Sequence, residues 1–268
     1  MPVSDIPDIG LGTYENTDHD RCAWSVKTAI NVGYRHVDTA QIYDNETAVG
    51  EGIAESDVDR DDLFVATKID SRNLGYDEVL EHTEACMDRL DVDVVDLLYV
   101  HWPIRTYDPE ATLAAFDHLY ENGTIRHIGL SNFTPPLLEE ALDVLESPLY
   151  AHQVECHPLL QQDELRGYAR EEGHYLVAYS PVMKGRVTEV PELVDIAERH
   201  DATPGQVSLA WLLSKENVVV IPKASSEDHI RENLAALYLT LDDTDVELID
   251  SIEREERLVD FDLAPWNT

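Results

Sequence analysis

The 268-residue sequence predicts an α/β fold, a parallel (β/α)8 TIM barrel with two extra C-terminal helices, as a single domain over residues 1–268. Short apolar or β-rich runs recur eight times along the chain. Between them lie segments with apolar residues at i, i+3 and i+4, the spacing of an amphipathic helix. Strands that alternate with helices form parallel sheets, and eight repeats without a linker or composition break favour closure into a barrel.

The eight runs are the expected strands, and they recur at a spacing that leaves room for a helix after most of them. In chain order they are residues 6–11, 34–38, 63–68, 94–101, 127–130, 151–155, 175–179 and 218–221. Helical spacing between them is seen, for example, in residues 22–32, 77–90, 111–120, 136–145 and 206–213. Pro204 follows the candidate N-cap Thr203, at a first helical turn where proline is tolerated. After the eighth run, residues 227–237 and 243–254 predict the two terminal helices.

An open, doubly wound sheet is the structural alternative. Such folds usually carry G-x-G-x-x-G after their first strand. The stretch from Gly10 to Tyr14 has the first two glycines and lacks the third, which favours the barrel.

The net charge is unusually negative, at −36 from 55 acidic and 19 basic residues. Such a charge repels nucleic acid and anionic membranes, so neither is an expected partner. The acids are spread along segments with regular apolar faces, which argues against disorder. We expect a solvated surface suited to concentrated salt, and therefore a halophilic source, because the Debye length falls to about 3 Å at 1 M salt.

Targeting and metal signals are missing from the sequence. No apolar run approaches the roughly 20 residues that span a bilayer, and residues 1–9 lack the features of a signal peptide, so a cytoplasmic protein is expected. We also expect a monomer. The three cysteines have no C-x-x-C spacing and the histidines no shared ligand pattern, so neither a disulfide nor a metal is expected.

Polar residues follow several of the expected strands. Asp38 ends the second strand and Tyr43 comes shortly after it, Lys68 ends the third, and His101 ends the fourth and precedes Trp102. Chemistry in a parallel barrel lies at the carboxyl ends of the strands. We therefore expect an acid, a phenol, an ammonium and an imidazole to converge there.

A family resemblance comes from seven motifs in chain order. They are D-T-A-Q-I-Y-D-N-E at residues 38–46, T-K at 67–68, H-W-P at 101–103, G-L-S-N-F at 129–133, Q-V-E-C-H-P at 153–158, A-Y-S-P at 178–181 and I-P-K at 221–223. Together they resemble the aldo-keto reductase family, and in particular its short prokaryotic members similar to 2,5-diketogluconate reductase. The resemblance extends from about residue 11 to about residue 233. It implies reduction of an aldehyde or ketone to an alcohol by hydride transfer from NADPH.

Physical chemistry supports catalytic roles for four residues. The usual pKa of tyrosine, about 10, is too high for efficient acid–base work near neutrality. A cation at Lys68 lowers the pKa of Tyr43, and Asp38 holds that lysine charged and oriented. His101 donates a hydrogen bond to the carbonyl oxygen. The family resemblance implies that Tyr43 supplies the proton as general acid.

The resemblance also implies a cofactor site. Tyr179 is expected under the nicotinamide, and Lys223 is expected on the 2′-phosphate of NADPH, for which a cation is the natural host. The implied cofactor-binding residues are Gly12, Thr13, Asp38, Ser131, Asn132, Gln153, Tyr179, Ser180, Val182, Gly185, Lys223, Ser225, Ser226, His229, Glu232 and Asn233.

Two positions depart from the family pattern. His229 occupies the place where the family often has an arginine on the phosphate, and Arg231 belongs to a different helix face, so NADH is expected as a second cofactor. Asp70 stands where larger relatives carry an aromatic pocket residue. The expected residues around a small carbonyl substrate are Tyr14, Ile42, Asp70, His101 and Trp102, with residues 258–266 closing one side.

Two other functions stay open at this point. The chain could be a non-catalytic, cofactor-binding regulatory subunit of the same fold. A buried Asp–Lys pair is commonly structural, so this pair alone does not establish catalysis. Lys68 could instead be the Schiff-base nucleophile of a barrel aldolase.

Overall fold

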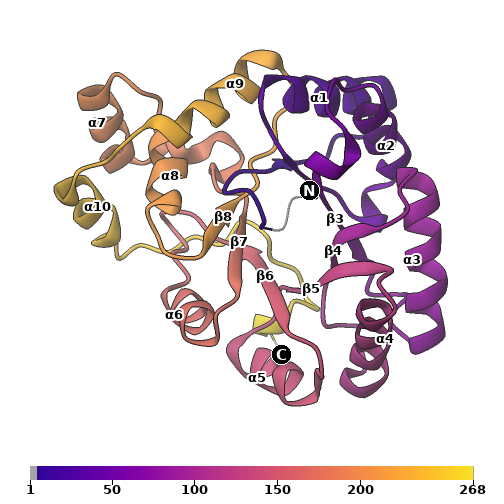
Figure 1. Ribbon diagram of the computed structural model, residues 1–268. Helices are drawn as coiled ribbons and strands as arrows, with labels where there is room; N and C mark the ends of the chain where they lie inside the picture. Colours follow the sequence, from indigo (N-terminus) through magenta and orange to yellow (C-terminus); the bar gives the residue numbers. More distant parts are fainter. Residues whose placement is uncertain (1–4, 268) are drawn as a thin grey trace.

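The computed structural model describes residues 5–267 and shows eight parallel strands that lie side by side in chain order (Figure 1). They are β1 (Leu11–Gly12), β2 (His36–Asp38), β3 (Phe64–Ile69), β4 (Val95–Val100), β5 (Ile125–Ser131), β6 (Leu149–Glu155), β7 (Tyr175–Tyr179) and β8 (Val218–Val220). Isolated parallel bridges join Ile9 to Val220 and Gly12 to Lys223. The first strand therefore also contacts the last, and the predicted (β/α)8 fold is confirmed.

The first strand is shorter than predicted. Residues 6–11 were expected to be extended sheet, but regular pairing begins at Leu11. Ile6 is instead buried at the amino end of the barrel, where its backbone N–H donates to the hydroxyl of Tyr150 over 2.9 Å. Pro7 has no N–H to offer a neighbouring strand, which explains why the ladder does not extend back to this point.

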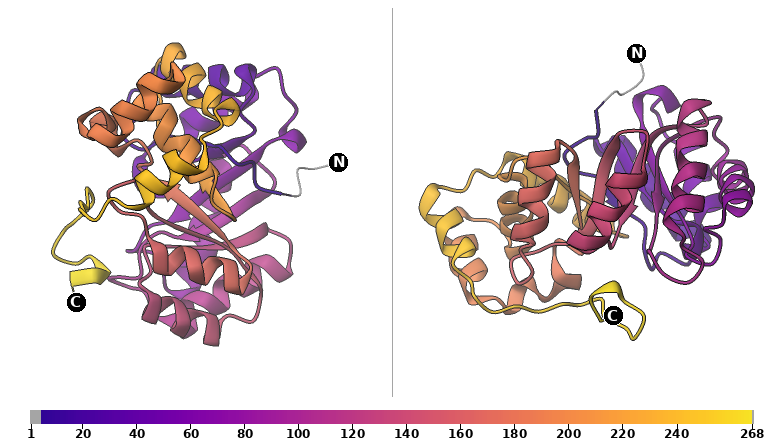
Figure 2. Two further views of the ribbon diagram at one scale, coloured as in Figure 1. Left: turned by 90° about the vertical axis from the view of Figure 1, so that its left-hand side faces the viewer. Right: turned by 90° about the horizontal axis from the view of Figure 1, so that it is seen from below.

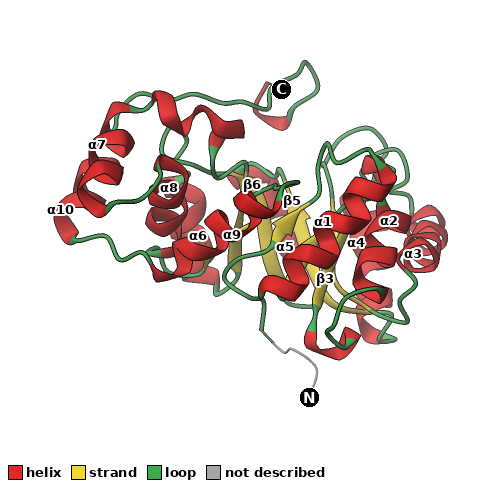
Figure 3. Ribbon diagram, turned by 90° about the horizontal axis from the view of Figure 1, so that it is seen from above, coloured by secondary structure: helices red, strands yellow, loops and turns green. Residues whose placement is uncertain are grey.

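Helices cover the outside of the strands (Figures 1 and 3). They are α1 (His19–Val32), α2 (Glu46–Ala54), α3 (Tyr76–Leu90), α4 (Pro109–Glu121), α5 (Pro135–Val144), α6 (Asp163–Glu172), α7 (Pro191–His200), α8 (Pro204–Leu213), α9 (Glu227–Ala235) and α10 (Asp243–Asp250). Every helical segment named from the sequence overlaps one of them. Both terminal helices are confirmed, although α10 ends at Asp250 rather than near residue 254. None of the helices in residues 5–267 is both long and apolar enough to cross a membrane.

Helices α2, α6 and α7 were not among the segments named from the sequence. In α2, glycines replace part of the apolar face because neighbouring backbone comes very close. A Cβ added at Gly50 would lie 2.5 Å from the carbonyl oxygen of Leu90, and one at Gly52 would lie 2.6 Å from that of Ala23. The apolar periodicity is therefore weak although the helix is well packed.

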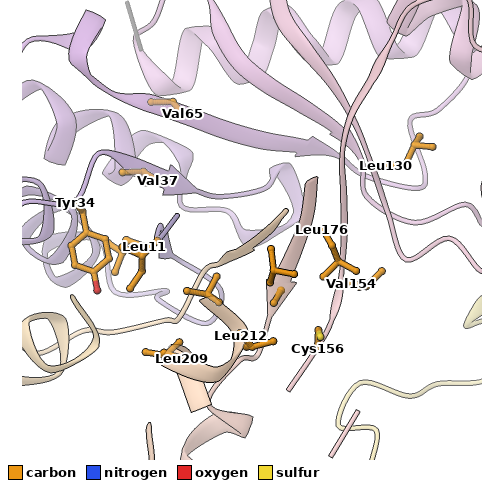
Figure 4. Packing of buried hydrophobic residues seen from close by; sticks show 14 of the residues in the cluster. Leu11, Tyr34, Val37, Val65, Leu130, Val154, Cys156, Leu176, Leu209 and Leu212 are labelled. Atoms are coloured by element: carbon orange, nitrogen blue, oxygen red, sulfur yellow. The ribbon is translucent and has the colours of Figure 1, made fainter. Parts of the chain in front are cut away.

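The larger hydrophobic core lies between strands and helices. Alternate strand residues point outward, as the two-residue period of a strand requires. Figure 4 shows part of this layer, where strand residues such as Leu11, Val37 and Leu176 lie with Leu209 and Leu212 of α8.

A second, smaller core fills the barrel interior. Phe64, Leu97 and Val177 point inward there beside the ring of Tyr99. A Cβ at Gly129 would lie 2.3 Å from that ring, so the glycine on β5 makes space for the tyrosine on β4. Polar side chains replace apolar ones toward the carboxyl ends of the strands, where Asp38 and Lys68 are buried.

After α10 the chain runs across the molecule as an extended segment, residues 251–267, which we call the tail (Figures 2 and 3). Its aromatic rings reach the loop after β4. The ring centroids of Trp102 and Phe261 are 4.9 Å apart, and those of Trp102 and Trp266 are 5.6 Å apart. The tail therefore lies over the end of the barrel where the predicted chemistry is placed.

Candidate active site

A cavity of about 890 Å³ opens at the carboxyl ends of the strands. This volume suits a cofactor or ligand of considerable size, since ligand pockets span roughly 300 to 1,000 Å³. Most of the residues predicted for a site line it. They are Gly12, Thr13, Tyr14, Asp38, Ile42, Tyr43, His101, Trp102, Ser131, Asn132, Gln153, Tyr179, Ser180, Val182, Gly185, Lys223, Ser225, His229, Glu232 and Asn233.

Lys68 does not line the cavity, because it is fully buried beneath it. Its Nζ donates to Oδ1 of Asp38 over 2.5 Å and to the carbonyl oxygen of Thr39 over 2.6 Å. The other carboxylate oxygen of Asp38 accepts from Nε2 of Gln153 over 2.8 Å. Two charges that are removed from water together need such partners, because burial penalises each charge alone.

Burial acts on both members of this pair. It raises the pKa of Asp38, and the Lys68 charge opposes that rise. It lowers the pKa of Lys68, and Asp38 opposes that fall. The pair is therefore a compact dipole rather than an isolated cation.

Tyr43 lies on a short 3-10 turn, Gln41–Tyr43, that brings its ring above this pair. The Lys68 Nζ is 5.1 Å from the centroid of the Tyr43 ring. The Tyr14 and His101 ring centroids are 5.2 Å and 5.7 Å from that of Tyr43, both in edge-on geometry. The phenol thus lies beside the ammonium and the imidazole that the strand-end pattern predicts, and beside a second phenol, that of Tyr14.

The sequence-based expectation for the pKa of Tyr43 is wrong in direction for this state of the protein. Burial raises the pKa of Tyr43 well above its usual value, and the charge of Asp38 raises it further. The Lys68 ammonium, 5.1 Å from the ring centroid, favours the phenolate but does not outweigh burial, since Asp38 lies 2.5 Å from that ammonium. The phenol consequently keeps its proton at neutral pH.

His101 is a neutral ring in this environment. Burial lowers its pKa to about 3, with the Lys68 charge acting in the same direction. A neutral imidazole can still donate one hydrogen bond. The backbone here is held in place, since Nδ2 of Asn132 donates to the carbonyl oxygen of His101 over 3.0 Å.

Tyr179 presents an aromatic ring at the end of β7, in the cavity wall. Its hydroxyl donates to Oδ1 of Asn132 over 2.9 Å, and Nδ2 of Asn132 also donates to the hydroxyl of Ser131 over 3.0 Å. The ring orientation is therefore set by a polar network. An aromatic face bordered by amides and hydroxyls suits a flat heteroaromatic ring.

The loop after Tyr179 has an unusual backbone. Ser180, Met183 and Lys184 have φ values of 51°, 51° and 53°, and Gly185 has 89°. Left-handed conformations cost energy for residues other than glycine and cluster at ligand-binding sites. Mixed left- and right-handed turns direct N–H groups inward and form anion-binding concavities. Within the loop, the N–H groups of Met183 and Gly185 donate to the carbonyl oxygens of Ser180 and Val182, each over 2.8 Å.

The far end of the cavity lies at the start of α9. The Lys223 ammonium makes one weak contact there, 3.4 Å to the Ser225 hydroxyl. Arg231 pairs with Glu227 on the outside of the helix over 2.8 Å. The prediction that Arg231 belongs to another face of the helix is confirmed. Lys223 and His229 are the basic residues that line this end of the cavity.

Two predicted residues lie elsewhere. Ser226 does not line the cavity; its hydroxyl caps α9 by accepting from the His229 backbone N–H. Asp70 also lies outside the lining, because its carboxylate accepts from Nη2 of Arg72 over 2.5 Å and from the Arg72 backbone N–H over 3.0 Å. Its neighbour Ser71 takes the place on the cavity wall.

Several lining residues were not predicted. Arg105 follows β4, Lys184 belongs to the loop after β7, and Thr203 begins α8. The tail contributes Val259 and Phe261, so part of residues 258–266 lines the cavity. Proximity to the H-W-P and A-Y-S-P motifs could have indicated Arg105 and Lys184, but no sequence signal indicated Thr203.

No group of three or more metal-ligating side chains occurs among residues 5–267. An aromatic wall, a loop with a left-handed backbone and an available lysine line one continuous cavity, and this set fits a nicotinamide dinucleotide. The fold and these groups define a (β/α)8-barrel oxidoreductase.

Comparison with known proteins agrees with this class. Residues 8–254 match the model of the Aldo/keto reductase family, and the chain belongs to that family. It is 40% identical over 254 residues to the glyoxal reductase of Bacillus subtilis, covering 95% of this chain and 91% of that protein. It is 39% identical over 267 residues to the methylglyoxal reductase DkgB of Escherichia coli O157:H7, covering 98% and 99%.

A solved structure shows the same likeness in three dimensions. A crystal structure assigned to a 2,5-diketo-D-gluconic acid reductase B superposes with a TM-score of 0.93 at 35% identity, covering 97% of this chain and 93% of the other. The protein is thus an oxidoreductase of the aldo/keto reductase family.

Proposed function

We propose that the protein reduces an aldehyde or ketone to an alcohol with NADPH. The observation that carries this proposal is the cluster of Asp38, Lys68, Tyr43 and His101 at one end of a cofactor-sized cavity. Bound NADPH supplies the hydride for the carbonyl carbon. The chain must supply the proton and stabilise the charge that develops on the oxygen.

Tyr43 is the proton donor in this proposal. Its hydroxyl is protonated before the reaction and so has a proton to give, but burial adds to the cost of the phenolate, which must be offset during the transfer. The neutral His101 ring donates a hydrogen bond to the same carbonyl oxygen and so orients it. Once Tyr43 has given up its proton, the nearby Lys68 ammonium stabilises the phenolate until solvent returns a proton.

The cofactor would lie along the cavity from Tyr179 to α9. Tyr179 would stack against the nicotinamide, with Ser131, Asn132 and Gln153 near its carboxamide. The loop residues Ser180, Val182 and Gly185 would hold the pyrophosphate. Lys223 would bind the 2′-phosphate, and with His229 in place of an arginine, NADH would be a usable second cofactor.

Small dicarbonyl compounds are the substrates to test first. Two relatives are named for glyoxal and methylglyoxal. Ile42, Trp102 and Phe261 give the substrate end an apolar wall, and Ile42 is 52% exposed there. A small carbonyl compound would be partly enclosed by these side chains and by the tail.

The decisive experiment follows NADPH oxidation with a panel of glyoxals, diketo acids and aromatic aldehydes in molar KCl. Turnover that depends on both NADPH and the carbonyl supports the proposal. Tight NADPH binding without any turnover would favour the regulatory-subunit alternative.

Borohydride trapping tests the aldolase alternative in the same preparation. A substrate adduct on Lys68 would favour a Schiff-base mechanism. The geometry opposes it, because Lys68 is fully buried and its ammonium donates to Asp38 and to the carbonyl oxygen of Thr39. An amine held charged in this way is a poor nucleophile.

A further inference from the structure

Arg105 lies in the cavity wall near the reacting groups. It belongs to the loop that begins with His101, and Trp102 and Ile104 of this loop line the cavity too. Residues proposed for the cofactor come instead from the ends of β5, β6 and β7, from the loop after β7 and from the region around the start of α9. Arg105 is thus on the substrate side of the cavity.

The charge of Arg105 has no counterpart in the described structure. Carboxylates pair with most of the 19 lysines and arginines of this acid-rich chain. In residues 5–267, the hydrogen bonds and ion pairs include none from the Arg105 side chain. An arginine that remains unpaired among 55 acids is available to an external anion.

The other cations around the cavity lie near a carboxylate or away from the substrate side. Lys68 is paired with Asp38 at 2.5 Å, and Lys184 lies 3.8 Å from Glu15. Lys223 is at the far end, beside Ser225. Arg105 is consequently the available positive charge on the substrate side of the described cavity.

The backbone holds Arg105 in a fixed position. Its φ is 61°, a left-handed conformation that costs energy for a residue with a side chain. The chain on both sides is anchored, since the Ile104 N–H donates to the carbonyl oxygen of Trp102 over 2.9 Å and the Thr106 N–H to that of Ser71 over 3.1 Å. Such anchoring fixes the backbone from which the side chain extends, so binding of a ligand need not order the loop.

Because the net charge of the protein is strongly negative, an unpaired cation in the cavity indicates the charge of the ligand. A net charge of −36 repels small anions from the surface. An anionic substrate would therefore gain from a cation placed inside the cavity, whereas a neutral carbonyl compound would gain nothing from it. The planar guanidinium can donate two parallel hydrogen bonds to a carboxylate.

We propose that Arg105 forms an anion subsite that binds the carboxylate of an oxo-acid substrate while the carbonyl group lies at Tyr43 and His101. This proposal rests on the proposed carbonyl reductase function and names its substrate class: aldehydes and ketones that also carry a carboxylate. Neutral glyoxals would bind without using the subsite.

The test compares acids with their own methyl esters, which keep the carbonyl group and lose the charge. Succinic semialdehyde and para-carboxybenzaldehyde, each with its ester, are assayed with wild type, Arg105→Gln and Arg105→Lys. We use the lowest KCl concentration that keeps the protein folded, because salt screens the contact. Arg170→Gln is the matched control, since Arg170 is an exposed arginine of α6 outside the cavity lining.

The expected result is a fall of at least about tenfold in the acid-to-ester ratio of kcat/KM in Arg105→Gln, in line with hydrogen bonds to a charged group. The loss should appear mainly in KM, with a smaller loss in Arg105→Lys and none in Arg170→Gln. An unchanged ratio in Arg105→Gln, or an equal fall in Arg170→Gln, would overturn the proposal. Efficient reduction of the esters alongside either outcome would leave the proposed reductase function standing.

A binding measurement keeps the test independent of turnover. Calorimetric titration with para-carboxybenzyl alcohol, the expected product, should show weaker binding to Arg105→Gln than to wild type in the presence of the cofactor. Equal binding would count against the subsite. Absence of turnover with every acid and ester would contradict the proposed function instead.

Discussion

The chemistry of single residues in this site depends on how charge is buried. Lys68 and Asp38 are removed from water as a pair, and the Thr39 carbonyl and Gln153 each make one further hydrogen bond with the pair. Tyr43 is close enough to Lys68 to respond to it once a phenolate forms. Removing Asp38, Lys68 or Tyr43 should therefore remove nearly all of the catalytic effect that these three residues have together.

Tyr43→Phe should lose nearly all carbonyl reduction while NADPH affinity stays within about twofold of wild type. General acid catalysis contributes roughly 10² to 10⁴ in rate, so kcat should fall by about that factor. Lys68→Met should be similarly inactive, and the double variant should be no slower than either single one. The measurements are kcat and the Kd for NADPH.

Lys68→Met leaves Asp38 buried without its partner, so the fold of this variant needs a control. Asp38→Asn combined with Lys68→Met removes both charges and should unfold at a higher temperature than Lys68→Met alone. Additive losses of kcat in the Tyr43 and Lys68 variants would contradict a coupled unit, as would more than a few per cent of activity in Tyr43→Phe.

Cofactor choice is the second prediction at this scale. Lys223 alone should give a moderate preference for NADPH, because a single charge-assisted contact contributes about 1.5 to 3 kcal/mol and is weakened by salt. His229→Arg should raise the NADPH-to-NADH ratio of kcat/KM by adding a planar, always-charged donor. Lys223→Ala should lower it. A ratio unchanged in both variants would show that the adenosine end of the cofactor lies elsewhere.

Among the structural elements, the tail is held in place by hydrogen bonds to one buried side chain. Glu155, buried at the end of β6, accepts from the backbone N–H of Leu258 over 2.6 Å and of Val259 over 2.9 Å. His157 Nδ1 accepts from the Leu159 N–H over 3.3 Å, which leaves its Nε2 to donate to Glu155 over 2.9 Å. A buried carboxylate thus holds the segment that presents Val259 and Phe261 to the cavity.

Glu155→Gln should loosen the tail, because an amide provides one neutral acceptor where the carboxylate provides two charged ones. The KM for carbonyl substrates should rise roughly tenfold, the scale of a hydrogen bond to a charged group, with little change in NADPH affinity. Trypsin should also cleave faster after Arg254 and Arg257. Asp163→Asn, which removes an exposed pair with Arg166, is the control. Unchanged KM and unchanged cleavage would show that the tail is held by its other contacts.

Across the whole molecule, buried histidines link stability to pH. Burial lowers the pKa of His36, His101 and His152 to about 3 and that of His174 to about 4. In the unfolded chain the usual value is about 6.5. Between these values the unfolded chain binds protons that the folded chain does not, so stability is complete above pH 6.5 and is lost as the pH falls.

The free energy of unfolding should therefore decrease below about pH 6.5 by up to roughly 1.4 kcal/mol per pH unit for each such histidine. Denaturant titrations from pH 8 to pH 4.5 measure this slope. His152→Leu removes one of these groups and should reduce the slope by about one proton. Constant stability over this range would contradict the burial of neutral histidines.

The surface acids give the second prediction at this scale. Raising KCl from roughly 0.1 M to 2 M should increase both activity and the unfolding temperature, since the Debye length falls from about 10 Å to below about 3 Å and repulsion among the acids weakens. An enzyme that is fully active and stable in low salt would contradict the halophilic interpretation. Comparing the unfolding temperature in sodium sulfate and in KCl at equal ionic strength distinguishes charge screening from the stabilising effect of a salt that is excluded from the protein surface.

Much of the fold and the centre of the site could be predicted from local patterns. Strand runs and helical spacing recur in order, and parallel strands bring their carboxyl ends to one edge. Asp38, Tyr43, Lys68 and His101 therefore had to approach one another, although they are far apart in the chain.

Other features depend on contacts between distant residues and on the water that those contacts exclude. The side chain of Asp70 turns to Arg72, the tail is held by Glu155 more than 100 residues earlier, and Arg105 is left without a carboxylate. The rise in the pKa of Tyr43 also depends on the packed structure, since burial outweighs the neighbouring cation. Local periodicity carries no information about desolvation or long-range pairing, because both arise only when the packed barrel brings these groups together.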